Sequence, residues 1–407
     1  MKPIGPIPPE FAAQSGMLTI AGERADALVA AHGSPLFVYD LGIVAARVAR
    51  FRAAMPAAVS LHYAVKANPH PAVIAGIAPL VDGLDVASAG ELEKALVVKP
   101  ATAISFAGPG KRDAELAAAI RAGATLNAES ASEVRRALAI GDRLGIAPRL
   151  AVRVNPDLEL RGSGMKMGGR ASPFGIDAER VPGVVRTIVT AGADYRGFHI
   201  FAGSQALDAE AVVETQAATL ALAGRLADES GQMPPKVNLG GGFGIPHFAG
   251  DRALDVERIG AALGEALAAS ALTAAGTAYA IELGRWLVGE AGVYLTRVVD
   301  RKESRGETFV VVDGGLHHQL AASGNFGTVV RRNYPVAVAG RMGAEATDVA
   351  SVVGCLCTPL DRLADRVALP LADEGDVVAV FIAGAYGLSA SPAGFLGHPV
   401  PAEVVLR

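Results

Sequence analysis

The sequence is poor in cysteine, has no long hydrophobic run and carries little net charge, and each shortage excludes a class of protein. Its two cysteines, Cys355 and Cys357, are two positions apart, which excludes a disulfide scaffold and favours a reducing cytoplasm. No apolar run is long enough to cross a membrane, and the proline-rich first residues do not resemble a signal peptide. A formal net charge of −4 gives no basic footprint for nucleic acid or an anionic membrane.

The chain has a globular composition with a strong periodic pattern. Its 407 residues are 51% hydrophobic, enough for two domains with a large core. Eight strand-like segments alternate with Ala- and Leu-rich helical segments, at 62–65, 83–87, 104–107, 125–128, 150–154, 197–201, 236–239 and 279–282. This count predicts a closed, TIM-like (β/α)8 barrel. An open doubly wound sheet would alternate too, but no Gly-x-Gly-x-x-Gly fingerprint follows the first strand.

The pattern changes after Glu282. Short β-rich runs follow, separated by Gly, Asp and Pro turns, and no long helical period appears. Strand-like segments that precede the barrel pattern are expected to join this all-β part. The sequence therefore predicts an α/β fold class in two domains: a barrel at 34–285, and a β domain formed by 1–33 and 286–407.

Lys66 ends the first predicted barrel strand, just before a turn marked by Asn68-Pro69. Lysine is seldom buried without a partner, and desolvation lowers the pKa of an amine, which suits Schiff-base chemistry on an aldehyde. A surface lysine that snorkels to solvent fits this stretch equally well. The other strand ends have to decide between the two interpretations.

Polar residues and glycines gather where the predicted strands end, which is where barrels place their reactive groups. The residues at these ends are Lys66, Asp85, Ser88, Gly108, Gly110, Glu129, Asn155, His199, Phe201, Gly240, Gly241, Gly242 and Glu282. Such a ring is hard to explain by packing, so it supports both the barrel and a site at its mouth.

The glycine run 240–242 follows the seventh strand, where barrels favour phosphate, and consecutive glycines let backbone amides approach an anion. A tight turn that needs positive φ would also select glycine. Glu282 and Arg285 end the eighth strand and would ordinarily form a structural ion pair. Beside a phosphate, Arg285 gains an anionic target, and Glu282 is then placed to pair with a protonated ring nitrogen.

Other signals in the C-terminal part are weaker. Tyr386 lies between glycines, which is also common for a core tyrosine. Cys357 lies in a turn, either as an inert thiol or as a catalytic proton donor. A metal site would need more Cys or His at ligand spacing near the two cysteines, so no metal is expected. The loop residues His317 and His318 serve either substrate binding or the surface.

Together these motifs resemble the fold-type III pyridoxal phosphate decarboxylases, the relatives of diaminopimelate, ornithine and arginine decarboxylases. The matching stretches follow the family's order over nearly the whole chain, at 63–68, 85–92, 174–176, 203–205, 240–244, 282–285, 357–361 and 384–387. The resemblance implies a barrel plus a β domain, bound pyridoxal 5'-phosphate and a homodimer with shared active sites.

The resemblance also implies roles for residues. Lys66 is the Schiff-base lysine, Glu282 pairs with the pyridine nitrogen, and Cys357 of the partner subunit handles the proton returned to Cα. The ring accepts the electrons freed when CO₂ leaves. The other implied cofactor contacts are Asp85, His199, Phe201, Ser204, Gly240, Gly241, Gly242, Arg285 and Tyr386.

Three positions depart from the family pattern. Phe201 replaces the histidine that stacks on the cofactor, although an aromatic face can still stack there. Leu283 replaces a proline. Thr358 replaces the acid that binds the distal amino group of diamino substrates, and a neutral hydroxyl cannot offset a desolvated ammonium. Ornithine, lysine and diaminopimelate are therefore expected to be poor substrates.

A closer resemblance is to the butirosin-type decarboxylase of a glutamyl group on an acyl carrier protein and to the exosortase-associated decarboxylases. The shared stretches are 166–169, 313–318, 357–359 and 391–399. This implies a carrier-tethered or modified amino acid, with substrate contacts at Thr358, Arg332 and Tyr334. Arg331 or Arg332 would meet a phosphopantetheine phosphate.

Other readings stay open at this point. One is a decarboxylase of a free amino acid such as diaminopimelate. Another is a racemase of the alanine racemase type, although such racemases place an arginine at the ring nitrogen, where this chain has Glu282. A non-catalytic relative need not keep Lys66, Glu282 and Cys357 together, as this chain does.

Overall fold

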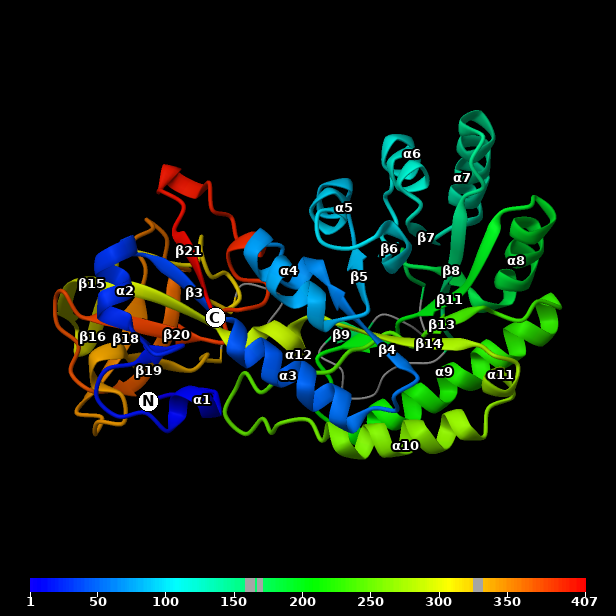
Figure 1. The fold of residues 1–407 in the computed structure, drawn as a ribbon. Helices are drawn as coiled ribbons and strands as arrows, with labels where there is room; N and C mark the ends of the chain where they lie inside the picture. The colour runs from blue at the N-terminus through cyan, green and yellow to red at the C-terminus, as the bar shows by residue number, and fades with distance from the viewer. Residues whose placement is uncertain (158–164, 167–170, 325–331) are drawn as a thin grey trace. The chain divides into compact units, whose positions relative to one another are not determined.

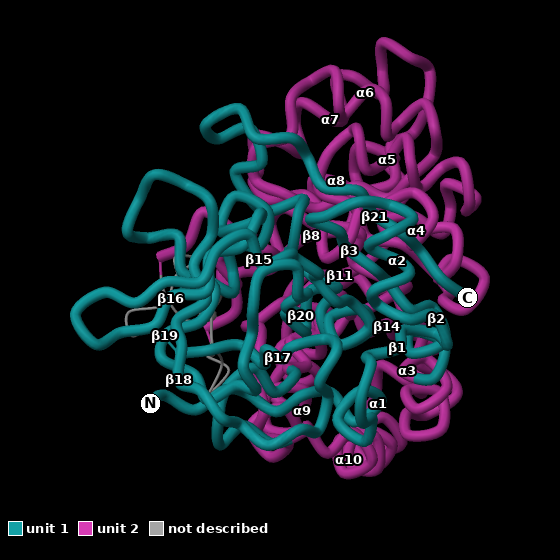
Figure 2. The backbone as a smooth tube through the Cα atoms, turned by 90° about the vertical axis from the view of Figure 1, so that its left-hand side faces the viewer, with its two compact units in different colours: residues 1–46, 245–252, 285–407 teal, residues 47–244, 253–284 magenta. Residues whose placement is uncertain are grey.

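A computed structural model describes residues 1–157, 165–166, 171–324 and 332–407 (Figure 1). Residues 167–169 of one motif and Arg331 lie outside these residues. The chain divides into two compact units, coloured in Figure 2. The barrel unit comprises 47–244 and 253–284, and the sheet unit comprises 1–46, 245–252 and 285–407. Among the described residues, no helix is long and apolar enough to span a membrane.

The barrel unit is built on eight parallel strands whose first and last members pair, so the sheet closes. In order around the barrel they are β4 (Val59–Ala64), β5 (Gly83–Val86), β6 (Ile104–Phe106), β7 (Thr125–Ala128), β8 (Arg149–Asn155), β11 (Asp194–Ile200), β13 (Lys236–Asn238) and β14 (Ala278–Leu283). A short strand, β10 (Ile176–Asp177), adds to β8. The predicted (β/α)8 barrel is confirmed.

Helices connect the barrel strands, and capping residues set where several of them begin and end. The main helices are α4 (Pro71–Ile77), α5 (Ala89–Leu96), α6 (Asp113–Ala122), α7 (Ala131–Leu144), α8 (Val181–Thr190), α9 (Ala209–Ser230) and α10 (Val256–Ala268). The side chains of Ser88 and Ser130 accept hydrogen bonds from the backbone of Glu91 and Glu133, so α5 and α7 start right after strands β5 and β7. Short links of this kind keep the strand-end residues in one rim.

Polar side chains line the interior of the barrel. The His62 Nδ1 atom lies 3.3 Å from Asp85 Oδ1, and its Nε2 atom lies 2.8 Å from Lys236 Nζ. The Ser105 hydroxyl donates to Asp85, and Asn127 donates to Ser105 at 3.3 Å. Outward-facing residues such as Leu61 are fully buried under the helices.

The sheet unit holds the predicted all-β part, which is confirmed. Its strands run in the order β17 (Val336–Val338), β20 (Val377–Phe381), β15 (Gly292–Ser304), β16 (Glu307–Val312), β18 (Asp348–Val353) and β19 (Arg362–Leu369). The early strand β3 (Leu36–Asp40), which lies inside the range 34–285 predicted for the barrel, joins this sheet between β15 and β21 (Ala402–Leu406). Aromatic residues fill its core, with the Phe37 and Tyr294 ring centroids 4.7 Å apart.

Candidate active site

Lys66 lies in a single 3₁₀ turn, η1 (Val65–Ala67), directly after β4. The neighbours Val65 and Ala67 are buried, and the Tyr63 hydroxyl donates to the Asn68 carbonyl at 2.9 Å, which fixes the turn. Lys66 itself is exposed, and its Nζ atom lies 5.9 Å from the ring centroid of Phe201. The buried amine considered from the sequence is therefore not found, and the amine is instead open to a ligand at the barrel mouth.

Glu282 lies near the end of β14, beside the strand that leads to Lys66, with Leu283 in register with Tyr63. Its Oε2 atom is 3.1 Å from His199 Nε2 and accepts a hydrogen bond from Asn238 Nδ2 at 3.2 Å. Burial alone would raise the pKa of Glu282, but its interactions with His199, Lys66 and Arg153 outweigh burial and hold that pKa below its usual range. Glu282 is therefore a buried, ionised carboxylate.

The glycine run after β13 is required by its backbone and by its neighbours. Gly240 and Gly242 have φ values of 70° and 83°, which favour glycine. A Cβ atom on Gly240 would meet the Ile200 carbonyl at 2.6 Å, and one on Gly241 would overlap the Glu282 carbonyl. The turn therefore packs its bare backbone against the ends of β11 and β14, beside Glu282.

Ser204 and Phe201 come from the segment that follows β11. Both are partly exposed, and Ser204 belongs to β12 (Gly203–Ser204), which pairs with β9 (Met165–Lys166). The Ala206 amide donates to the Gly242 carbonyl at 2.9 Å. The Ser204 segment and the glycine turn are thus joined at the same end of the barrel.

Glu129 braces the rim next to this site. Its carboxylate accepts from the Gly108 amide at 2.6 Å, from Arg153 Nη1 at 2.7 Å and from the Gly175 amide at 2.8 Å. Burial raises the pKa of Glu129, but the Arg153 charge outweighs it, and the pKa falls below its usual range. The sequence placed Glu129 at a strand end but missed Arg153 as its partner.

Asp85 is the last but one residue of β5. It lies with His62 and Ser105 in the polar interior described above. Glu91, in the first turn of α5, accepts a hydrogen bond from the Ala87 amide at 2.7 Å, and burial raises the pKa of Glu91. Its charge also interacts with that of Lys66, so Glu91 is a neighbour of the site that motif reasoning did not single out.

In the sheet unit, four predicted site residues gather around His247. The Arg285 guanidinium lies 4.7 Å from the Tyr386 ring centroid and 3.4 Å from His247 Nε2. The His247 and Tyr334 rings are 5.2 Å apart, and Arg332 lies 3.9 Å from the ring of Phe248, which packs on Tyr334. Burial, then the Arg285 charge, lowers the pKa of His247 to about 3, so its imidazole is neutral. No sequence motif singled out His247.

Cys357 and Thr358 lie in the turn after β18. Cys357 is exposed and Thr358 is half-buried, with its hydroxyl accepting from the Leu360 amide at 3.3 Å. Each unit therefore assembles its own set of predicted residues, with Lys66, Phe201 and Glu282 in one and Arg285, Tyr386 and Tyr334 in the other.

Comparison with known proteins gives consistent matches along the chain. The family described as pyridoxal-dependent decarboxylase, pyridoxal binding domain, matches residues 41–289. The L-glutamyl-(BtrI acyl-carrier protein) decarboxylase of Niallia circulans is 35% identical, covering 92% of this chain and 89% of that protein. The 2-((L-alanin-3-ylcarbamoyl)methyl)-2-hydroxybutanedioate decarboxylase of Staphylococcus aureus is 30% identical, covering 91% and 93%. The structure of diaminopimelate decarboxylase from M. jannaschii in complex with L-lysine is 25% identical, with a TM-score of 0.84 and coverage of 99% and 92%.

Proposed function

Because the chain belongs to the pyridoxal-dependent decarboxylases, we propose that it removes the α-carboxylate of an amino acid whose side chain is tethered to a carrier protein or otherwise modified. Decarboxylation of an amino acid and the use of pyridoxal 5'-phosphate are properties of the family. The substrate, the roles of individual residues and the dimer are parts of the proposal.

The barrel mouth fits the cofactor. An exposed lysine amine over an aromatic face, an ionised buried carboxylate and a glycine turn that admits no Cβ atom lie at the same end of the barrel. Lys66 would hold the aldehyde, Phe201 would cover the ring face, and Ser204 with the glycine turn would take the phosphate. When bound, pyridoxal phosphate supplies a sink for the electron pair freed as CO₂ leaves.

Glu282 has the properties that a partner of a ring nitrogen needs. Its carboxylate is buried and ionised, and Asn238 and His199 fix its orientation. A negative charge in a site of low dielectric keeps a proton on a facing pyridine nitrogen. An arginine there, as in the racemase alternative, would disfavour that proton, so Glu282 favours decarboxylation over racemisation.

Roles for the sheet-unit residues rest on the sequence resemblance and on contacts within that unit. Arg285 follows Glu282 by three positions, and its guanidinium is held over Tyr386 and beside the neutral His247. A fixed guanidinium suits a phosphate. We assign Arg285 and Tyr386 to the cofactor phosphate, and Arg332 and Tyr334 to the substrate.

Thr358 is the observation that carries the choice of substrate. Diamino substrates present a distal ammonium, which needs a carboxylate when it leaves water, and Thr358 offers a hydroxyl. Two relatives are named for a glutamyl group on a carrier protein and for a carbamoyl-linked alanine. Neither of these named substrates has a distal ammonium. The likeness to diaminopimelate decarboxylase leaves a free diamino acid as the competing candidate.

A panel assay of CO₂ release separates the two candidates. We expect an L-glutamyl-loaded acyl carrier protein to be turned over at least about 100-fold faster than diaminopimelate, lysine or ornithine. A rate ratio of about 100-fold corresponds to about 2.7 kcal/mol, which is the cost of leaving a charged group unpaired. Thr358→Glu is expected to narrow this gap by improving diaminopimelate turnover, and Thr358→Ser, the matched control, should keep it. Rapid turnover of diaminopimelate by the unmodified enzyme would reject the proposal.

A further inference from the structure

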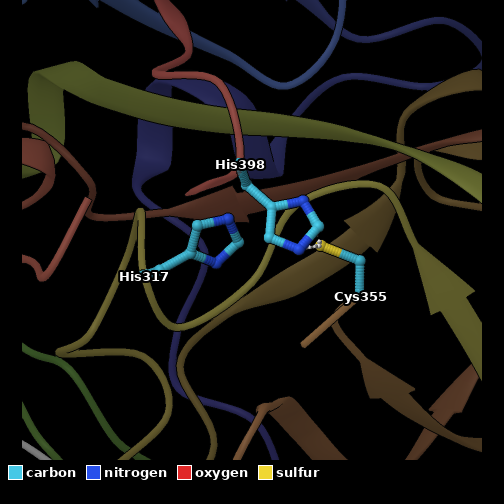
Figure 3. Close-up of side chains that lie close together, drawn as sticks. All are labelled: His317, Cys355 and His398. Atoms are coloured by element: carbon cyan, nitrogen blue, oxygen red, sulfur yellow. Dashed lines mark hydrogen bonds between the residues drawn. The ribbon is translucent and has the colours of Figure 1, made fainter. Parts of the chain in front are cut away.

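Three side chains of the sheet unit bring metal-type ligand atoms together, as Figure 3 shows. They are His317, Cys355 and His398, and one ligand atom of each lies within 4.8 Å of the other two. They come from the loop after β16, the turn after β18 and the segment before β21. The cysteine is 38 residues after the first histidine and 43 before the second, so the fold, and not a local motif, creates the cluster.

His317 is the member that most requires an explanation. It is fully buried, and neither of its ring nitrogens has a hydrogen-bond partner among the residues that the structure describes. A buried polar group without a hydrogen-bond partner is costly, and a bound ion is one of the explanations for it. Its ring centroid lies 5.2 Å from that of His398, and imidazole nitrogens are common metal ligands.

Asp361 holds the two ligand-bearing loops in place. Its Oδ1 atom accepts from the Leu316 amide at 2.7 Å and its Oδ2 atom from the Leu356 amide at 2.9 Å, so each oxygen holds the neighbour of a ligand. Gly315 and Gly354 make room, because a Cβ atom on either would collide with this carboxylate. Outer carboxylates of this kind orient the ligands of metal sites.

The local charge also suits a cation. The carboxylates of Asp361 and Asp313 act electrostatically on the Cys355 side chain. A bound metal ion would compensate a thiolate and these two carboxylates together. The Cys355 Sγ atom already lies 3.8 Å from His398 Nδ1.

We propose that His317, Cys355 and His398 form a binding site for a divalent transition-metal ion of the Zn²⁺ type. Imidazole and thiolate ligands select such ions, and three protein ligands leave a fourth position for water. Tetrahedral Zn–N and Zn–S bonds of about 2.0 and 2.3 Å place ligand atoms about 3.5 Å apart, so the trio closes by about 1 Å. On binding, Cys355 forms the Zn–S bond and releases its proton to solvent.

The site would fasten three segments that are far apart in the sequence. One of them is the turn that carries Cys357, two residues beyond the ligand Cys355. If Cys357 returns the proton to Cα, as the sequence resemblance implies, the metal positions it without touching substrate. Metal binding itself does not depend on that role, so it is tested by metal content and spectroscopy.

The test uses the full-length protein loaded with its cofactor, stripped of metal and titrated with Zn²⁺ against a chromogenic chelator. We expect one equivalent of Zn²⁺ per chain and, by X-ray absorption, one sulfur neighbour at about 2.3 Å. Cys355→Ser should lose the sulfur signal and at least about tenfold in affinity, with Cys357→Ser as the matched control that keeps both. His398→Gln should retain the sulfur but bind more weakly.

The outcomes separate the proposal from incidental binding. Absence of Zn²⁺ uptake at micromolar concentration, a site without sulfur, or equal losses in Cys355→Ser and Cys357→Ser would each overturn it. If Cys355→Ser does not fold, His398→Gln, which changes a half-buried residue, decides the question by the same titration. None of these readouts depends on decarboxylase activity, so they stay informative if the proposed substrate is wrong.

Discussion

The two units handle their reactive groups differently. In the barrel unit the charges near the mouth are paired within the chain, as with Glu129 and Arg153 or Glu282 and His199. In the sheet unit Cys357 is exposed, and the ring nitrogens of His317 have no partner in the part of the chain that the structure describes. The two units therefore differ in how far the rest of the described chain supplies hydrogen-bond and ion-pair partners for their reactive groups.

The largest expected effect on activity comes from mixing two inactive variants, one changed in the barrel unit and one in the sheet unit. Lys66→Ala and Cys357→Ala are each expected to lose activity by at least about 10³-fold, because each removes a group that forms or breaks bonds. If the active site is shared in a homodimer, subunit exchange restores one intact site in half of the dimers, about a quarter of wild-type activity. The measurement is CO₂ release after co-refolding equal amounts.

The control for mixing is the same experiment with Lys66→Ala and Glu282→Ala. Both changes lie in the barrel unit, so no mixed dimer regains an intact set of barrel residues, and activity stays at background. No recovery with Cys357→Ala, or the same recovery in this control, would contradict a shared active site.

Glu282→Gln probes the barrel side alone, with a smaller effect. Glutamine keeps the shape and the bond from Asn238 but removes the negative charge that holds a proton on a facing ring nitrogen. We expect a loss of about 10²-fold in kcat with retained cofactor binding, since charge stabilisation acts mainly in the transition state. Asn238→Ala, which removes one donor but leaves the Glu282 carboxylate, should lose less, and the reverse ranking would refute the assigned role.

The sequence predicted the part of this molecule that repeats. Strand-like segments that alternate with helical segments predicted the barrel, which the parallel sheet of β4 to β14 confirms. Spacing could not reveal His317, Cys355 and His398, because only the sheet brings residues so distant in the chain together. His247 was missed for the same reason, since its neighbours Arg285 and Tyr334 follow it by 38 and 87 positions.

The solvent exposure of Lys66 was a second property that could not be predicted from the sequence. Lysine at a strand end is compatible with burial or with solvent, and the choice depends on how the η1 turn packs. Here Val65 and Ala67 fill the core on either side, which turns Lys66 outward over Phe201. The roles of Thr358 and Cys357 stay predictions, because both depend on molecules other than this chain.

Glu129→Gln is expected to change the catalysed reaction least. It tests how far the paired charges of the barrel rim stabilise the fold. Loss of the carboxylate leaves Arg153 buried without its partner, which costs about 3 kcal/mol in the free energy of unfolding. The folded pKa of Glu129 is lowered, so its contribution is fully present above its unfolded pKa of about 4.3 and is lost as the pH falls through the folded value.

Urea unfolding of the Glu129→Gln variant and wild type at several pH values measures this contribution. The difference in unfolding free energy should be constant from pH 8 to about pH 5 and shrink below about pH 4. The control is Glu257→Gln, which breaks an exposed pair with Arg50 and should change stability by less than about 1 kcal/mol. A Glu129 effect no larger than the control's would mean that the rim charges are not a source of stability, and the contrast between the units would then lie in exposure alone.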